Sequence, residues 1–275
     1  MKRAIHILLA CIALIAAFSC STTRVLQDGD YRLARNKITI TNDSEFNSNT
    51  LEPYLKQQPN PAFILGWNPF LYVYNWSNGK GKTWDKIVKS IGVEPVVYDS
   101  DMVEATIENI MDRLTYLGYY GSSIESRIQV KKKNVYVTYD VTLGKRLPIK
   151  DIEINLPAEG TFADDFLADT SSMTFKIGDY LSEDILEKET VRSSAALRNM
   201  GYYEFSKNNF FFEADTLSYP DSAILKMTIN GYTRNETPDR ARAISRFTFN
   251  EVNISYPQTL KIREKILKEL TTIRP

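Results

Sequence analysis

Two stretches of the chain carry clear periodic patterns of apolar residues. Between residues 103 and 117 apolar side chains recur every three or four positions, which is typical of a helix with one buried face: Val103, Ile107, Ile110, Met111, Leu114 and Leu117. Gly118 follows directly, where a helix commonly ends in a left-handed residue. From Val135 to Leu143 apolar and polar residues alternate, which predicts a half-buried strand.

The same order of predicted elements occurs again further along the chain. The sequence "LTYLGYY" at 114–120 returns as "LRNMGYY" at 197–203, each time after a predicted helix and before two predicted strands. Gly118 and Gly201 lie 83 residues apart, a spacing longer than the roughly 20 to 50 residues of solenoid repeats. We therefore expect an α+β fold built of tandem domains, each with the order β-α-α-β-β.

The N-terminus is typical of an export signal. Lys2 and Arg3 precede the apolar residues 7–18, a run shorter than the roughly 20 residues that a helix needs to cross a bilayer. Small residues then lead to Cys20, as in the lipobox of a bacterial lipoprotein, with Ala17 where that motif most often has Leu. We predict a signal peptide at 1–19 and a lipid on Cys20. The alternative is an ordinary secretory signal followed by an unrelated cysteine.

Removal of this signal would leave little catalytic chemistry. Cys11 and His6, the single histidine, would leave with it, so that Cys20 would be the one remaining cysteine. No disulfide, Cys/His zinc site, histidine-based triad or thiol nucleophile is then expected. We predict a protein that is not an enzyme and binds no cofactor or metal.

Charge and glycine motifs exclude two further classes of protein. The chain has 34 basic and 34 acidic residues, so it lacks the positive charge of a nucleic-acid-binding protein. The stretch "GKGKT" at 79–83 resembles the end of a P-loop, but Trp76 stands where that loop needs its first glycine. We expect a flexible turn there and no nucleotide.

Turn residues and changes of composition divide the rest of the chain. We expect a lipid-anchored polar tether at 20–36, a first domain at 37–146 with an aromatic-rich insertion at about 62–99, and a second domain at 147–234. We also expect an incomplete third domain at 244–275, with one predicted strand and one predicted helix. Because these two elements cannot close a core, we expect the sequence to be a fragment.

Two groups of residues leave alternatives open. The aromatic residues of the insertion suit packing in the first domain's core, packing on a neighbouring domain, or contact with a membrane interface near the lipid anchor: Trp67, Phe70, Tyr72, Tyr74 and Trp76. Two carboxylate clusters suit either the first turns of helices, where they compensate the helix dipole, or an exported hydrolase that uses paired carboxylates: Asp164, Asp165 and Asp169, and Glu183, Asp184 and Glu187.

The order of these features resembles the POTRA (polypeptide-transport-associated) domains of the BamA/TamA family. The stretches "AFSC", "YRLARNKITI", "IGVEPVVYD", "LTYLGYY", "LPIKDIEI" and "FKIGDYLS" are similar to those of TamL-type lipoproteins of Bacteroidetes. The resemblance implies a periplasmic arm, held to outer-membrane lipid through Cys20, that binds unfolded outer-membrane protein clients or periplasmic partner proteins. It also implies that a C-terminal β-barrel is missing from this fragment. The competing interpretation is a self-standing periplasmic adaptor lipoprotein.

An unpaired sheet edge binds extended peptides by strand addition. The resemblance suggests that this edge is the strand after each Gly-Tyr-Tyr, at residues 122–130 and 205–213. The candidate residues are Ser122, Ile124, Ser126, Ile128 and Val130 in the first strand, and Phe205, Lys207, Asn209, Phe211 and Glu213 in the second. The alternative is that both strands lie in the interior of their sheets.

Overall fold

The computed structural model describes residues 22–63, 68–77, 79, 81, 83–157, 160–231, 241–248 and 251. The predicted signal peptide, Cys20 and most of the predicted third domain lie outside these residues. Among the residues that the structure describes, no helix is long and apolar enough to span a membrane.

The chain divides into two compact units. The first contains Met1–Asp151 and two shorter segments, Phe175–Leu186 and Asp215–Ile224. The second contains Ile152–Thr174, Glu187–Ala214 and Leu225–Pro275. This division differs from the contiguous domains expected at 37–146 and 147–234, because two segments from later in the sequence pack with the first unit.

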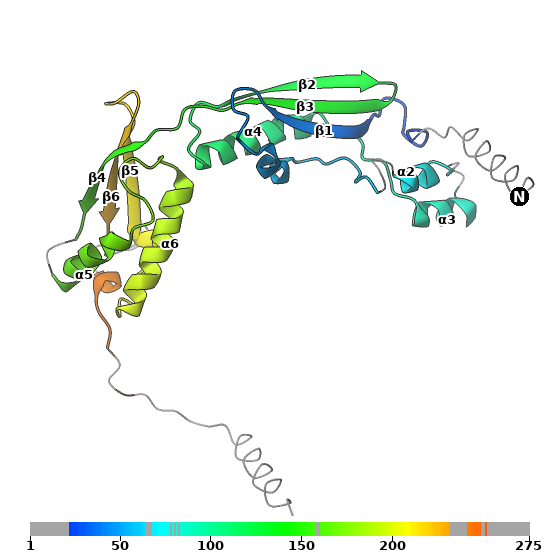
Figure 1. Ribbon diagram of the computed structural model, residues 1–275. Helices are drawn as coiled ribbons and strands as arrows, with labels where there is room; N and C mark the ends of the chain where they lie inside the picture. The colour runs from blue at the N-terminus through cyan, green and yellow to red at the C-terminus, as the bar shows by residue number, and fades with distance from the viewer. Residues whose placement is uncertain are drawn as a thin grey trace, which may run out of the picture. The chain divides into compact units, whose positions relative to one another are not determined.

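The first sheet consists of β1 (Arg32–Ile40), β2 (Ser123–Lys131) and β3 (Asn134–Thr142) in the order β1-β3-β2. The central strand β3 runs parallel to β1 and antiparallel to β2. Its alternating apolar residues are buried as the sequence predicted: Val135, Val137, Tyr139 and Val141. Helix α4 (Asp101–Tyr116) lies along one face of this sheet (Figure 1).

Two clusters form the core between α4 and the first sheet. Val103 of α4 packs with Leu33 of β1 and the first part of β3. Ile110 and Leu114 pack with the end of β3 and with Leu51 of the 3-10 helix η1 (Ser48–Tyr54). The predicted amphipathic helix and the predicted alternating strand therefore form the two halves of one core.

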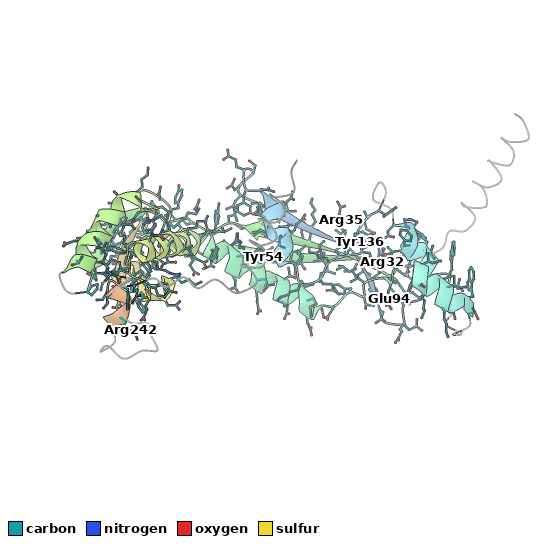
Figure 2. All side chains as sticks on the ribbon, turned by 90° about the horizontal axis from the view of Figure 1, so that it is seen from below. Arg32, Arg35, Tyr54, Glu94, Tyr136 and Arg242 are labelled. Carbon is teal, nitrogen blue, oxygen red and sulfur yellow. The ribbon has the colours of Figure 1, made fainter. Side chains whose placement is uncertain are left out.

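The expected tether at 20–36 is wrong in its last five residues, because β1 begins at Arg32. Leu33 is buried under α4, and the Nε of Arg32 donates a hydrogen bond to Asn134 Oδ1 at 2.8 Å. Figure 2 shows Arg32 and Arg35 of β1 with Tyr136 of β3 at one end of this sheet. Burial lowers the pKa of Arg32.

The insertion, which the sequence left without regular structure, contains helices α2 (Pro69–Tyr74) and α3 (Thr83–Ile91). The two helices pack against each other (Figure 1). The Asn68 side chain caps α2 by accepting a hydrogen bond from the Phe70 N–H. Of the aromatic residues discussed above, Phe70, Tyr72 and Tyr74 are half-buried, Trp76 is exposed and Trp67 lies outside the described residues.

The second sheet consists of β4 (Ile149–Asn155), β5 (Phe210–Asp215) and β6 (Ala223–Ile229) in the order β4-β6-β5. Helices α5 (Thr161–Asp169) and α6 (Glu183–Asn199) lie beside this sheet (Figure 1). Its core is rich in aromatic side chains: Phe162, Phe166, Tyr202, Phe205 and Phe210. Three short 3-10 helices complete the described elements: η2 (Thr170–Ser172), η3 (Lys207–Asn209) and η4 (Ala241–Ile244). The predicted α+β class with repeated β-α-α-β-β order is confirmed.

Each Gly-Tyr-Tyr motif ends a helix with the same hydrogen-bond pattern. After α4, the Gly118 N–H donates to Thr115 O, and the Tyr119 N–H donates to Leu114 O, both at 2.8 Å. After α6, Gly201 and Tyr202 make the equivalent bonds to Arg198 and Leu197. Both glycines have positive φ, at 84° and 105°. The repeated motif is therefore a Schellman cap, in which only glycine is free of strain.

Candidate functional site: the sheet edges

Strand β2 forms one edge of the first sheet. It pairs with β3 without a bulge, from Ser123 opposite Thr142 to Lys131 opposite Asn134. In the part of the chain that the structure describes, no other strand pairs with its outer side. The sequence left open whether this strand lies at the edge or in the interior of its sheet, and the strand order shows that it lies at the edge.

The direction of the backbone groups of β2 follows from its partner strand. Val141 O of β3 accepts a hydrogen bond from the Thr41 N–H just after β1, so the backbone groups of Val141 point towards β1. Because these groups alternate along a strand, Ile124, which lies opposite Val141, turns its own N–H and C=O away from β3. The same alternation gives outward-pointing groups to Ser126, Ile128 and Val130.

The two faces of β2 differ in chemistry. Ile124 and the residues at every second position after it share the face of the sheet that α4 covers, because they lie opposite the buried residues of β3. Ile124 itself packs against the core, while Ile128 and Val130 remain 47% and 53% exposed. The opposite face carries Ser123, Glu125, Arg127, Gln129 and Lys131. The edge thus presents free backbone groups beside two uncovered apolar side chains.

The other edge of this sheet is partly covered. The Leu33 N–H of β1 donates to Val96 O at 2.8 Å, and the Tyr98 N–H donates to Tyr31 O at 2.7 Å. An isolated bridge pairs Arg32 with Val97. The end of the insertion therefore occupies the start of β1, which leaves β2 as the more accessible edge.

Ser122 does not belong to the edge. It precedes β2 and is 7% exposed, and its hydroxyl donates to Tyr119 O and accepts from the Gly144 N–H, both at 2.9 Å. Its role is to close the turn that follows the first Gly-Tyr-Tyr. The predicted edge is therefore corrected at this position.

The second predicted edge is also shorter than expected. Strand β5 is an edge strand, but it begins at Phe210, so the first three predicted residues precede it. Phe205 is buried against Phe162 and Phe210. Lys207 and Asn209 form η3, in which the Asn209 side chain accepts from the Ser206 N–H at 3.0 Å. The buried Phe205 and the capping box of η3 therefore lie where the sequence predicted the first half of an alternating strand.

Phe211 and Glu213 are the two predicted residues that lie in β5. Glu213 is exposed and forms an ion pair with Lys226 of β6 at 3.5 Å. Because β5 has six residues against nine in β2, it offers a smaller number of backbone groups to a partner.

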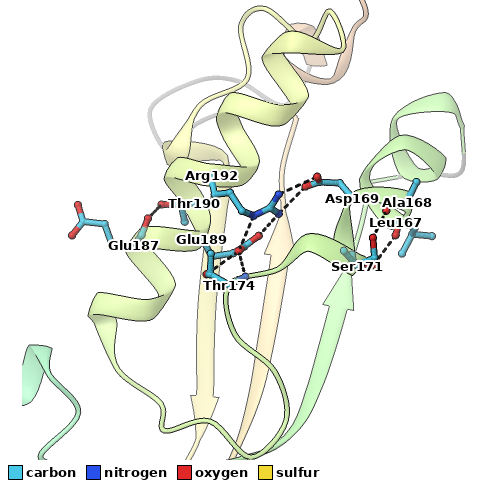
Figure 3. A network of polar contacts seen from close by, with 10 residues as sticks. Leu167, Ala168, Asp169, Ser171, Thr174, Glu187, Glu189, Thr190 and Arg192 are labelled. Carbon is cyan, nitrogen blue, oxygen red and sulfur yellow. Dashed lines mark hydrogen bonds and ion pairs between the residues drawn. The ribbon is translucent and has the colours of Figure 1, made fainter.

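Two residues of the first carboxylate cluster, Asp165 and Asp169, have structural partners. Asp169 is the last residue of α5, so the expected compensation of a helix N-terminus is wrong for it. It forms a two-point ion pair with Arg192 of α6, at 3.0 and 2.7 Å (Figure 3). Asp165 accepts a hydrogen bond from the Tyr202 hydroxyl at 2.7 Å. These contacts connect elements of the second unit to one another.

Glu189 of α6 completes the network of Figure 3 and was missed by the sequence analysis. It is 2% exposed, and its carboxylate accepts from the Thr174 N–H at 2.8 Å and from Arg192 Nη2 at 2.6 Å. Asp169 and then Glu189 raise the pKa of Arg192 by hydrogen bonding. The signal in the sequence was the spacing of three residues between Glu189 and Arg192.

Two further features lie in or beside the insertion. The Gly81 N–H of "GKGKT" donates to the Asp85 carboxylate at 2.7 Å, so this turn binds its own helix. An open cavity of about 450 Å³ lies against the insertion, and its lining residues carry both signs of charge, including Arg24, Asp30, Lys89 and Glu94. Among the described residues, no group of His, Cys, Asp and Glu side chains could hold a metal ion.

Comparison with known proteins defines the class of the first domain. Residues 35–144 match the family model POTRA, described as "Surface antigen variable number repeat". This range contains the first sheet from Arg35 onward and α4. The chain therefore contains a POTRA domain, and the predicted POTRA fold is confirmed for this part. No curated protein sequence is significantly similar to the chain.

Several solved structures are distantly similar. BamA POTRA3-5 from Haemophilus influenzae is 15% identical, with a TM-score of 0.39, over 86% of this chain and 79% of that one. BamA from Haemophilus ducreyi lacking POTRA domains 1-3 is 14% identical, with a TM-score of 0.37, over 74% of this chain and 30% of that one. POTRA1-3 of Omp85 from Anabaena is 12% identical, with a TM-score of 0.27, over 73% of this chain and 65% of that one. These similarities are too low to transfer a function.

Proposed function

We propose that this chain is the periplasmic POTRA arm of an outer-membrane protein assembly or translocation factor of the BamA/TamA type. It binds extended segments of client chains or of partner proteins by strand addition at β2. Acylation of Cys20 holds it to the outer membrane, facing the periplasm. Its work is binding and positioning, without a catalytic step.

The observation that supports this proposal most directly is the free edge of β2. A strand added there would bond to the outward backbone groups of Ile124, Ser126, Ile128 and Val130. Its alternate side chains would lie beside the exposed Ile128 and Val130, on the face that α4 covers. Backbone bonding tolerates many sequences, which suits a protein that binds varied clients.

A proline substitution tests the edge because it removes one outward backbone donor. Ile128→Pro deletes an N–H that makes no bond to β3, and proline is tolerated on edge strands whose N–H faces solvent. We expect this change to weaken the binding of a fluorescent ten-residue peptide of alternating apolar and polar residues by about tenfold or more, measured by anisotropy. Ile128→Val, the control, keeps both the N–H and an apolar side chain and should leave the affinity nearly unchanged.

The thermal unfolding of each variant is measured in parallel, so that a lost fold is not mistaken for a lost edge. A folded Ile128→Pro variant that binds the peptide as tightly as the unchanged protein would exclude strand addition at β2.

A further inference from the structure

Helix α3 of the insertion carries an exposed apolar stripe. Trp84, Ile87 and Ile91 are 52%, 46% and 57% exposed. Their spacing of three and four residues places them on one side of the helix. Asp85 and Val88, by contrast, are 3% and 2% exposed and face inward. Trp84, Ile87 and Ile91 therefore form an exposed apolar face on the side of α3 away from its buried residues.

The orientation of α3 is held by specific contacts. The Asp85 carboxylate accepts hydrogen bonds from the Ser77 hydroxyl at 3.1 Å and from the Gly81 N–H at 2.7 Å. At the other end of the helix, a side chain at Gly92 would overlap the backbone of Tyr74 in α2. Because both ends are fixed, α3 cannot roll to bury its stripe, and the three apolar residues stay outside.

The insertion is tied to the residues that follow Cys20. Asn75, at the end of α2, is fully buried, and its side chain donates to Thr22 O at 3.0 Å and accepts from the Val25 N–H at 3.1 Å. Thr22 is two residues from Cys20, and two extended residues span at most about 7 Å. In Figure 1 the first described residues, in dark blue, lie at the same end of the first sheet as α2 and α3. A lipid on Cys20 would therefore bring the insertion to the membrane surface.

The charges around the stripe suit a phospholipid surface. Lys86 and Lys89 of α3 are exposed, and the Lys89 ammonium lies 5.8 Å from the centre of the Tyr74 ring. The acidic residue within the helix, Asp85, is buried and engaged as described. Burial, and then a hydrogen bond with Glu94, which follows the helix, raise the pKa of Tyr74. Exposed lysines beside Trp and Ile side chains are typical of helices that lie in the membrane interface.

We propose that Trp84, Ile87 and Ile91 form a membrane-docking face, which inserts into the headgroup region of the bilayer that holds the lipid on Cys20. The inference goes beyond strand addition, but it rests on the proposed acylation of Cys20 for its location. A lipid on Cys20 tethers the chain without fixing its orientation, and the docking face adds a second contact next to the anchor. It also holds the first unit, and with it the β2 edge, at a set orientation to the membrane.

A single environment-sensitive label tests this face in the whole protein. The chain without its signal peptide would contain no cysteine other than Cys20, so Ile91→Cys provides a unique site for the NBD fluorophore when the Cys20 thiol is acylated. If Cys20 carries no lipid, Cys20→Ser is added to each protein before labelling. Val191→Cys on α6 is the matched control, because Val191 is 56% exposed against 57% for Ile91. Both proteins are reconstituted with vesicles of phosphatidylethanolamine and phosphatidylglycerol, and the floating fraction is measured.

We expect the label at position 91 to shift to shorter wavelength and to be quenched severalfold more strongly by brominated lipid than the label at position 191. Adding Ile87→Glu to the Ile91→Cys protein should remove most of this difference, since Ile87 is exposed and its replacement leaves the core intact. Equal, water-like emission from both positions in the floating fraction would overturn the proposal and would leave the stripe as a surface for another protein.

The mass of the N-terminal peptide separates this proposal from the proposed anchor. If Cys20 carries no lipid but the protein floats with a quenched label at position 91, the docking face is supported and the anchor is wrong. If the unacylated protein does not float, the docking face is overturned as well.

Discussion

Gly118 combines two separate requirements at a single position. Its φ of 84° is strained for any residue with a side chain, and a Cβ there would also overlap the carbonyl oxygen of Leu181. Gly121, three residues on, has a similar φ of 71° but open space around it. The pair separates the cost of backbone strain from the cost of a steric overlap.

We therefore expect Gly118→Ala to destabilise the first unit by about 3 kcal/mol or more, and Gly121→Ala by about 1 kcal/mol. All three tryptophans of the chain lie before residue 85, within the first unit. Urea unfolding followed by tryptophan fluorescence measures both changes in the free energy of unfolding. Equal effects of the two substitutions would mean that the overlap with Leu181 is relieved at no cost.

The two tyrosines of the second Gly-Tyr-Tyr lie in different environments. Tyr202 is buried in the aromatic core, where it contacts Phe162 edge to face and donates to Asp165. Tyr203 is 68% exposed and lies outside this core. Burial, and then the hydrogen bond to Asp165, raise the pKa of Tyr202 to about 12.

This shift predicts a loss of stability at alkaline pH. Because the pKa of Tyr202 is higher in the folded state than in the unfolded chain, where it is about 10, the protonated hydroxyl favours folding at any pH below about 10. As the pH rises from about 10 to about 12 this contribution is lost, and the free energy of unfolding should fall by about 2 kcal/mol. Tyr202→Phe should cost about 1 kcal/mol at pH 8, through the lost hydrogen bond. Because the variant has no group to ionise at this position, the difference from the unchanged protein should vanish near pH ~11, and the variant should be the more stable protein by about 1 kcal/mol near pH ~12. Urea unfolding followed by circular dichroism across this range measures it, with Tyr203→Phe as the exposed control.

At the scale of elements, α6 is a polar helix that buries charge. It buries Glu189, Thr190, Ser193, Ser194 and Leu197, so its stripe cannot be recognised from apolar residues alone. The buried charge of Glu189 is compensated by its ion pair with Arg192 and by the hydrogen bond that it accepts from the Thr174 N–H. Through Arg192 the network also reaches Asp169, and it thereby connects α6 to the end of α5 (Figure 3).

Removing the buried Glu189 carboxylate takes one ion-pair partner from Arg192, which keeps Asp169, and takes the acceptor from the Thr174 N–H. We expect Glu189→Ala to lower the free energy of unfolding by about 3 kcal/mol, as measured by urea unfolding at pH 7. Glu187→Ala on the same helix should change it by less than about 0.5 kcal/mol, because the Glu187 side chain is 52% exposed and lies 3.8 Å from Lys207. A small effect of Glu189→Ala would show that water or a rearranged Arg192 replaces the carboxylate.

At the scale of the whole molecule, the two units repeat one plan with different cores. Each contains a three-stranded sheet with the last strand of the unit at its centre, and each ends its long helix in a Schellman cap. The first unit surrounds β3 with aliphatic residues, while the second buries a group of aromatic side chains. The shared plan explains why the element order was readable from the sequence although the two halves are dissimilar in detail.

The sequence by itself determined the elements whose pattern is local. The stripe of α4, the alternation of β3 and the glycine after each long helix depend on neighbouring residues, because helix and strand periods are properties of the backbone. The POTRA resemblance followed from the order of these elements. Local patterns also failed in identifiable places: β1 begins at Arg32, hidden among polar residues, and α2 and α3 lie where aromatic and glycine residues obscured any period.

The tertiary structure alone decided which groups are free to bind. Strand order made β2 an edge and turned the backbone groups of Ile128 outward, and the packing of Phe205 removed it from the second edge. The buried Asp85 fixed the direction of α3, which left Trp84, Ile87 and Ile91 exposed near the chain that follows Cys20. Exposure depends on residues that are distant in the sequence, so no local pattern contains it.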